Sequence, residues 1–223
     1  MQAGVIAIDG PAGAGKSTIA KLTAEQLGYN YIDTGAMYRA ITLLASRVGV
    51  EPDDPGLVTL ALRADFRFQP TPSGLVIYLN GEDVTAAIRD PHVSGRVSYY
   101  AREAVVREAL TRMQRRLAAD GNVILEGRDI GTVVLPEADK KFFITATPRE
   151  RARRRQIDLR DQGFETDIDE LERQIAERDL IDSTRELAPL KPAPDAVIVD
   201  TTGKSIAEVL GIIVSEVRQT DVL

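Results

Sequence analysis

The stretch GPAGAGKST, Gly10 to Thr18, combines small residues with one lysine and two hydroxyl side chains. Its Gly10, Gly15, Lys16 and Ser17 have the G-x-x-x-x-G-K-S spacing of a phosphate-binding loop. Small residues let the backbone curl until its N–H groups converge on an anion, and a following helix adds the positive end of its dipole. In this pattern the lysine reaches the β- and γ-phosphates and the serine hydroxyl ligates Mg²⁺. The sequence therefore predicts a nucleoside triphosphate site formed by Gly10, Pro11, Ala12, Gly13, Ala14, Gly15, Lys16, Ser17 and Thr18.

The segments around this loop have the order that such a site requires. The β-branched run VIAID, residues 5–9, predicts a buried strand before the loop, and the apolar spacing of residues 16–27 predicts a helix after it, ended by Gly28. Further apolar runs predict strands in 29–33, 122–129, 140–147 and 194–201, with helical patterns between and after them. Strands that alternate with helices predict an α/β fold with a mostly parallel sheet flanked by helices.

One region departs from this alternation. Residues 65–84 contain short alternating runs around Asn80-Gly81, a dipeptide that favours a tight hairpin turn, so we expect a small antiparallel insertion of about three strands. Residues 97–119, with Val106, Leu110, Met113 and Leu117 as an apolar stripe, predict one continuous helix.

Composition excludes several classes of protein. The chain has no cysteine and one histidine, His92, which removes disulfides, thiolate nucleophiles and zinc sites built from these residues. Its net charge of -6 argues against a protein that coats nucleic acid. The absence of a long apolar run argues against a membrane span. We expect a cytoplasmic protein that acts as a monomer on small molecules.

Charged residues on two helical segments are candidates for chemistry. After Pro148, the residues Arg151, Arg154 and Arg155 share one helix face, which fits either a cationic lid over phosphates or an ordinary solvated helix. In the next helix, Arg178 and Asp182 continue the apolar stripe of Leu171 and Ile175, so both should point inward. The acidic residues that end the first two strands, Asp9 and Asp33, fit either outer ligands of Mg²⁺ or structural caps.

The motifs of the chain together resemble one family. IDGPAGAGKST, YIDTGAMYRA, VREALTRMQR, LEGRDIGTVV, ERARRR and ERDLIDSTRELAPL occur in this order over nearly the whole chain. With the insertion at 65–84, they make the chain similar to bacterial cytidylate kinases, within the nucleoside monophosphate kinase group. The resemblance implies a P-loop kinase with an arginine-rich helical lid, which transfers a phosphoryl group from ATP to CMP or dCMP with Mg²⁺.

The resemblance also implies roles for individual residues. Thr34, Arg39 and Arg128 are expected at the acceptor phosphate, and Arg178 and Asp182 at the sugar. The residues expected at the cytosine are Ser98, Arg107, Asp129 and Arg185. The catalytic set is Lys16, Arg128, Arg151, Arg154 and Arg155. The metal is expected on Ser17, with Asp33 in its outer shell.

The same resemblance divides the single kinase domain of 1–223 into functional regions. A core is expected in 1–33, 86–147 and 166–223, a monophosphate-binding region in 34–85 and a lid in 148–165.

Two other kinds of function remain open at this level. The loop also fits a kinase for another nucleoside monophosphate or a small alcohol, and a nucleotide-dependent switch without an acceptor. Cytosine offers an amino donor beside ring acceptors, so carboxylate or hydroxyl oxygens next to guanidinium groups suit it, as they do several purines.

Overall fold

The computed structural model describes residues 4–71, 74–161 and 163–220. Residues 72–73 of the expected insertion, residue 162 of the expected lid and both ends of the expected core, 1–3 and 221–223, lie outside this description. The chain forms two compact units, Met1–Asp33 with Leu117–Leu223, and Thr34–Arg116. The division into core, monophosphate-binding region and lid is a functional one and stays a prediction.

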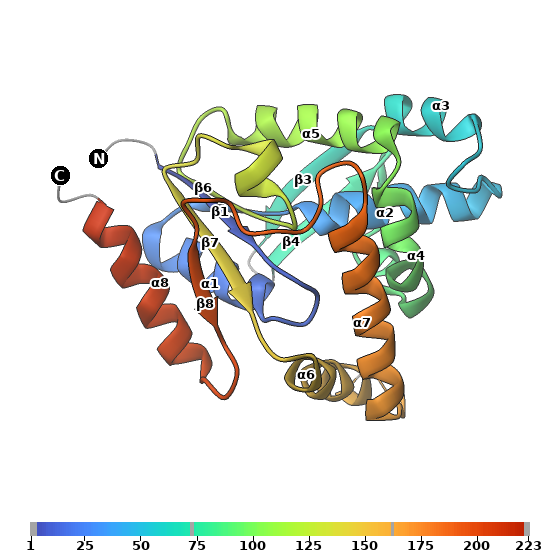
Figure 1. Ribbon diagram of the computed structural model, residues 1–223. Helices are drawn as coiled ribbons and strands as arrows, with labels where there is room; N and C mark the ends of the chain where they lie inside the picture. The colour runs from blue at the N-terminus through green and yellow to red at the C-terminus, as the bar shows by residue number, and fades with distance from the viewer. Residues whose placement is uncertain (1–3, 72–73, 162, 221–223) are drawn as a thin grey trace. The chain divides into compact units, whose positions relative to one another are not determined.

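The first unit is built on a five-stranded sheet (Figure 1). Its strands are β1 (Val5–Asp9), β2 (Asn30–Asp33), β6 (Val123–Glu126), β7 (Lys140–Thr145) and β8 (Val197–Asp200). Their order in the sheet is β2-β6-β1-β7-β8, and every neighbouring pair is parallel. The expected parallel sheet is confirmed, and all carboxyl ends therefore meet at one edge, where ligands of such sheets bind.

Alternating residues of the central strand β1 separate the two faces of this sheet. Ile6 and Ile8 pack with α1 (Lys16–Leu27) and α8 (Ile206–Thr220), which cover one face (Figure 1). Ala7 belongs to the core on the other face, which includes the short π-helical segment η2 (Ile130–Val134). Because successive side chains of a strand point to opposite faces of the sheet, β1 contributes residues to both cores.

Two further helices of the first unit follow β7. They are α6 (Pro148–Asp161) and α7 (Ile168–Thr184), and their apolar residues Ala152, Leu159, Leu171 and Ile175 form one buried cluster. The Asp167 side chain accepts the backbone N–H groups of residues 169 and 170 and so caps α7. The two helices that the sequence predicts here are confirmed, and they pack against each other.

The second unit has its own core and its own small sheet. Its helices are α2 (Thr34–Val48), α3 (Gly56–Arg63), the 3₁₀ turn η1 (Ala87–Arg89), α4 (Pro91–Ala101) and most of α5 (Ala104–Ala118). The antiparallel strands β3 (Phe66–Thr71), β4 (Gly74–Leu79) and β5 (Glu82–Asp83) form the expected three-stranded insertion. Asn80 and Gly81 both have positive φ, as a two-residue hairpin turn requires.

One expectation about the second unit is wrong, and one of its helices was not predicted. The continuous helix expected over 97–119 is interrupted between α4 and α5, where the guanidinium of Arg107 donates to the carbonyl of Ala101 at 3.0 Å and satisfies one exposed end of α4. The helix that the sequence reasoning missed is α3. Its Leu57 and Ala61 pack into the core of this unit.

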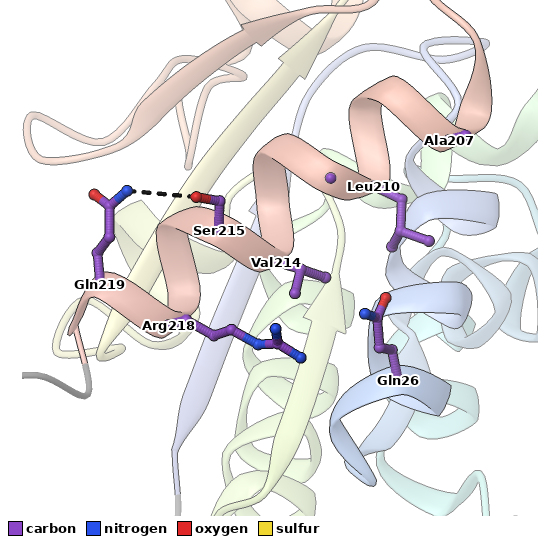
Figure 2. Close-up of a pocket in the computed structure, with 8 residues that line it drawn as sticks. Gln26, Ala207, Leu210, Val214, Ser215, Arg218 and Gln219 are labelled. Carbon is purple, nitrogen blue, oxygen red and sulfur yellow. Dashed lines mark hydrogen bonds between the residues drawn. The ribbon is translucent and has the colours of Figure 1, made fainter.

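A groove of about 650 Å³ lies between α1 and α8 (Figure 2). Gln26 of α1 and Leu210, Val214 and Arg218 of α8 line it. Gln26 is near the C-terminal end of α1, about three turns from the phosphate loop that precedes this helix. The groove is therefore a surface feature away from the predicted nucleotide site.

Candidate active site

The backbone of the phosphate loop has the curled shape that the sequence predicts. Gly10, Gly13 and Gly15 all have positive φ, and Gly15 immediately precedes the first turn of α1. A Cβ atom on Gly10 would lie 1.9 Å from the carbonyl oxygen of Ile144 in β7. Only glycine therefore lets this loop leave β1 so close to the neighbouring strand.

Lys16 is buried at the start of α1, with 4% of its surface exposed. Its Nζ donates to the carbonyl oxygen of Pro11 at 2.8 Å, so the side chain folds back over the loop. Burial, together with the guanidinium of Arg128, lowers the pKa of Lys16 to about 7, while the carboxylate of Glu126 acts in the opposite direction. An anion in the loop would stabilise the charged form of this amine.

Ser17 donates its hydroxyl to a carboxylate that the sequence reasoning did not assign. The acceptor is Oε1 of Glu126, the last residue of β6, at 2.8 Å. Its other oxygen, Oε2, accepts the phenol of Tyr31 from β2 at 2.6 Å. Burial, with the nearby carboxylates, raises the pKa of Tyr31 above its usual range, so the phenol stays a donor. The signal in the sequence was the acidic residue that ends the apolar run VILE.

The metal position expected at Ser17 has donors that suit Mg²⁺. Asp33 ends β2 directly opposite Glu126 in the register of the two strands, so two carboxylates lie at the strand ends beside the Ser17 hydroxyl. Among the described residues, no three His, Cys, Asp or Glu side chains gather as a metal cage. Mg²⁺ in phosphoryl-transfer sites keeps several waters and uses one or two protein oxygens plus substrate phosphates, so an oxygen set of this kind fits it.

The EGRD motif and the end of α7 are joined by two ion pairs. Arg128 Nε lies 3.2 Å from Oδ2 of Asp182, and Arg185 lies 3.5 Å from Oδ1 of Asp129. Asp129, Asp182 and Arg185 are all buried. The inward orientation expected for Asp182 is confirmed, whereas Arg178 is half-buried and lies 4.0 Å from Asp182. The structure thus brings together five predicted acceptor-site residues within the first unit.

Asp9 has a structural role in this arrangement. Its two carboxylate oxygens accept the backbone N–H groups of Ile130 and Gly131, each at 2.8 Å. These amides begin η2 immediately after Arg128 and Asp129. Of the two alternatives left open for Asp9, these hydrogen bonds support the cap, and they tie the EGRD motif to the end of β1.

The three arginines expected in the lid have different contacts. Arg151 is buried, pairs with Asp179 of α7 at 2.6 Å and donates to the Ala12 carbonyl of the phosphate loop at 3.2 Å. Arg154 bonds Glu150 at 2.9 Å, as the spacing allows, and also the hydroxyl and carbonyl of Thr201 at 2.9 and 2.8 Å. Arg155 is half-exposed on the same helix. Two of these side chains therefore already contact the loop or the strand end beside it.

The remaining predicted acceptor residues belong to the second unit. Thr34 is the buried first residue of α2, and Arg39 is half-buried one turn later. Ser98 is buried on α4, and the guanidinium of Arg107 on α5 lies 5.7 Å from the ring centre of Tyr38. The burial of Ser98 and Arg107 is compatible with nucleotide binding and equally with a packing role inside this unit.

Comparison with known proteins identifies the family. The family model for cytidylate kinase matches residues 6–219. The chain belongs to the cytidylate kinase family. It is therefore an ATP-dependent nucleoside monophosphate kinase, with CMP or dCMP as the acceptor.

Individual relatives agree with this assignment. The chain is 50% identical over 215 residues to a cytidylate kinase of Shouchella clausii, with 96% of each chain covered. It is 51% identical over 218 residues to one of Geobacter sulfurreducens, with 97% of this chain and 94% of the relative covered. It is also 53% identical to a bifunctional pantoate ligase/cytidylate kinase of Parasynechococcus marenigrum, of which it covers 43%.

Solved structures that resemble this chain share its fold at low sequence identity, so they support the fold alone. A protein of Eubacterium ventriosum aligns with 98% of this chain and 99% of its own, with a TM-score of 0.55 and 10% identity. A candidate kinase of Chloroflexus aurantiacus covers 99% of both chains, with a TM-score of 0.50 and 17% identity. Both likenesses agree with the observed α/β fold. Among the described residues, no helix is both long and apolar enough to cross a membrane.

Proposed function

We propose that this kinase binds the triphosphate of ATP in the loop Gly10–Thr18 and transfers its γ-phosphoryl group to CMP or dCMP. The observation that carries this proposal is the loop itself, curled by three positive-φ glycines between β1 and α1, with a buried lysine over it. Phosphoryl transfer depends mainly on positioning and charge stabilisation, so these groups suffice without a covalent nucleophile.

Mg²⁺ is the metal that the donor set suits. The Ser17 hydroxyl oxygen would hold it, with Glu126 and Asp33 accepting hydrogen bonds from its waters. The chemistry that it would supply, when bound with ATP, is neutralisation of negative charge on the phosphates. The protein's own contribution is to fix the Ser17 hydroxyl, through the bond to Glu126, at the first turn of α1.

The acceptor nucleotide is assigned to the charged residues after β6 and at the end of α7. Arg128 would bind its phosphate, and Arg178 and Asp182 its sugar. The buried pair of Asp129 and Arg185 offers a carboxylate acceptor beside a guanidinium, which matches the amino group and ring acceptors of cytosine. Further contacts are assigned to Thr34, Arg39, Ser98 and Arg107.

The catalytic charges are assigned to Lys16, Arg128 and the α6 arginines. Arg151 and Arg154 already contact carbonyls of the phosphate loop, at Ala12 and Ala14, so a small change of their rotamers would bring guanidinium groups to a bound phosphate. Guanidinium groups that converge on a transferring phosphoryl group accelerate its transfer by about 10³-fold or more.

An acceptor screen tests this function. ADP release is measured with ATP and Mg²⁺ in the presence of CMP, dCMP, UMP, AMP, GMP or no acceptor. We expect CMP and dCMP to give the highest kcat/KM and the reaction without acceptor to be slower by orders of magnitude. A preference for AMP or GMP would contradict the cytosine assignment, and slow hydrolysis that no acceptor stimulates would favour a nucleotide switch.

A further inference from the structure

Glu126 is held from both sides by hydroxyl groups of two other elements. Ser17 Oγ at the first turn of α1 donates to Oε1 at 2.8 Å, and Tyr31 Oη in β2 donates to Oε2 at 2.6 Å. Glu126 itself is buried, with 6% of its surface exposed. Each carboxylate oxygen therefore has a different donor, and the carboxylate plane is fixed between them.

The proton of Ser17 determines which way its oxygen can act. A serine hydroxyl has one proton and two lone pairs, so a hydroxyl that donates to Glu126 turns its lone pairs away from this carboxylate. Those lone pairs are what a cation can use. An unrestrained Glu126 could rotate and leave the hydroxyl to donate elsewhere, for example to a phosphate oxygen, which would turn its lone pairs away from the metal.

We propose that Tyr31 is a positioning residue for Mg²⁺·ATP. Its phenol locks Glu126, and Glu126 in turn keeps the Ser17 hydroxyl oriented with its lone pairs outward. This inference rests on the proposed placement of the metal at Ser17. Tyr31 touches neither nucleotide. It acts on Ser17 through the hydrogen-bonded chain Tyr31–Glu126–Ser17 and through the direct contact of its phenol with the Ser17 side chain.

The ring and the hydroxyl of Tyr31 have separable roles. The ring is half-buried and packs against the apolar core on the α1 and α8 side of the sheet. Phenylalanine keeps this packing and removes only the donor to Glu126. Tyr29 provides the matched control, because it precedes β2 by one residue and packs against the same core.

The test compares Tyr31→Phe with Tyr29→Phe in the full chain. Calorimetry measures the dissociation constant of ATP with saturating Mg²⁺ and again with EDTA. Partners that orient a metal ligand typically contribute 10- to 100-fold to metal affinity. We expect Tyr31→Phe to weaken binding of Mg²⁺·ATP about tenfold and to leave metal-free ATP binding unchanged. Tyr29→Phe should change neither constant.

A double-variant cycle with Ser17→Ala shows whether the effect passes through the serine. Once the Ser17 hydroxyl is absent, adding Tyr31→Phe should cause no further loss of Mg²⁺·ATP affinity. Equal weakening of ATP with and without Mg²⁺, an unchanged Mg²⁺·ATP constant, or an additive loss in the double variant would each overturn the proposal.

Two readouts separate this inference from its foundation. If the wild-type protein bound ATP equally with and without Mg²⁺, the metal placement itself would fail. If the wild type shows the metal effect and Tyr31→Phe retains it, only the role of Tyr31 fails. The KM for CMP should stay unchanged in Tyr31→Phe, because a general distortion of the fold would alter it as well.

Discussion

Replacing Gly10 by alanine tests how closely the phosphate loop is fitted to the sheet. The added Cβ would lie 1.9 Å from the carbonyl oxygen of Ile144, whereas real Cβ contacts are not found below 3.0 Å. Relieving this overlap requires the loop and β7 to separate by about an ångström, although β1 and β7 are adjacent central strands that pair up to Asp9 and Phe143. Gly10 also has φ +143, which strains any other residue.

The two costs can be added roughly. Backbone strain of this kind costs about 1–3 kcal/mol, and overpacking of a close contact costs about 1–3 kcal/mol more. We expect Gly10→Ala to lower the free energy of unfolding by about 4 kcal/mol, within the range of severe substitutions. It should also abolish ATP binding, because the amides of the loop would be displaced.

Gly28→Ala is the matched control, since Gly28 also has positive φ, +69, but nothing lies within 4 Å of its Cβ position. Only the left-handed backbone is penalised there, at about 1 kcal/mol. Urea unfolding followed by circular dichroism, with calorimetric titration of ATP, measures both variants. If Gly10→Ala were as stable as Gly28→Ala and bound ATP normally, the steric reasoning would be refuted.

The other predictions concern charge and metal. Lys16→Met should lower kcat by about 10³-fold in a protein that melts no earlier than wild type, because a buried charge is removed; earlier melting would show that the lysine serves the fold. Arg185→Met, which strips the buried Asp129 of its partner, should reduce the ratio of kcat/KM for CMP over UMP, and an unchanged ratio would count against the cytosine assignment. Burial raises the pKa of Asp9 from 3.8 to about 6, so its stabilising effect is full below the unfolded value and is lost as pH rises through 6. Urea unfolding should therefore show wild type gaining about 2 kcal/mol relative to Asp9→Asn between pH 7.5 and 4.5, and parallel pH profiles would contradict this. EDTA should stop turnover and added Mg²⁺ restore it; turnover unaffected by EDTA would remove the metal from the account.

The sequence predicted the features that depend on local pattern. The strand, loop and helix around Gly10–Lys16 could be read from spacing, because the same small residues that curl the loop also mark it. The Asn80-Gly81 turn and its flanking strands followed from the positive φ that this dipeptide accepts. Local chemistry determines these elements, so each could be predicted from its own segment of the sequence.

The missed features depend on side-chain contacts that apolar periodicity does not record. The break between α4 and α5 is stabilised when Arg107 reaches back to Ala101, and periodicity does not record such a contact. The first backbone N–H of η2, that of Ile130, donates to the carboxylate of Asp9, the last residue of β1. These two residues are 121 positions apart in the sequence. Neither contact can be recognised from the sequence around Ala101 or around Ile130.

The candidate site divides in the same way. Lys16 and Ser17 were identified from the loop pattern, but Glu126, the partner of Ser17, becomes apparent only when α1 and β6 are brought together. In the sequence Tyr31 is one aromatic residue of a predicted strand, and its role becomes apparent only from the hydrogen bond between its phenol and Glu126. The ion pairs of Arg128 and Arg185 with carboxylates on other elements likewise come from tertiary structure.

The most direct test of the account follows the phosphoryl group itself. Phosphorus NMR of the purified protein with ATP, CMP and Mg²⁺ should show one CDP formed for each ADP, with no release of inorganic phosphate above the rate without CMP. The same mixture with Lys16→Met should show neither product at a comparable rate. Consumption of ATP by the wild-type protein to ADP and inorganic phosphate, without CDP, would contradict the central claim.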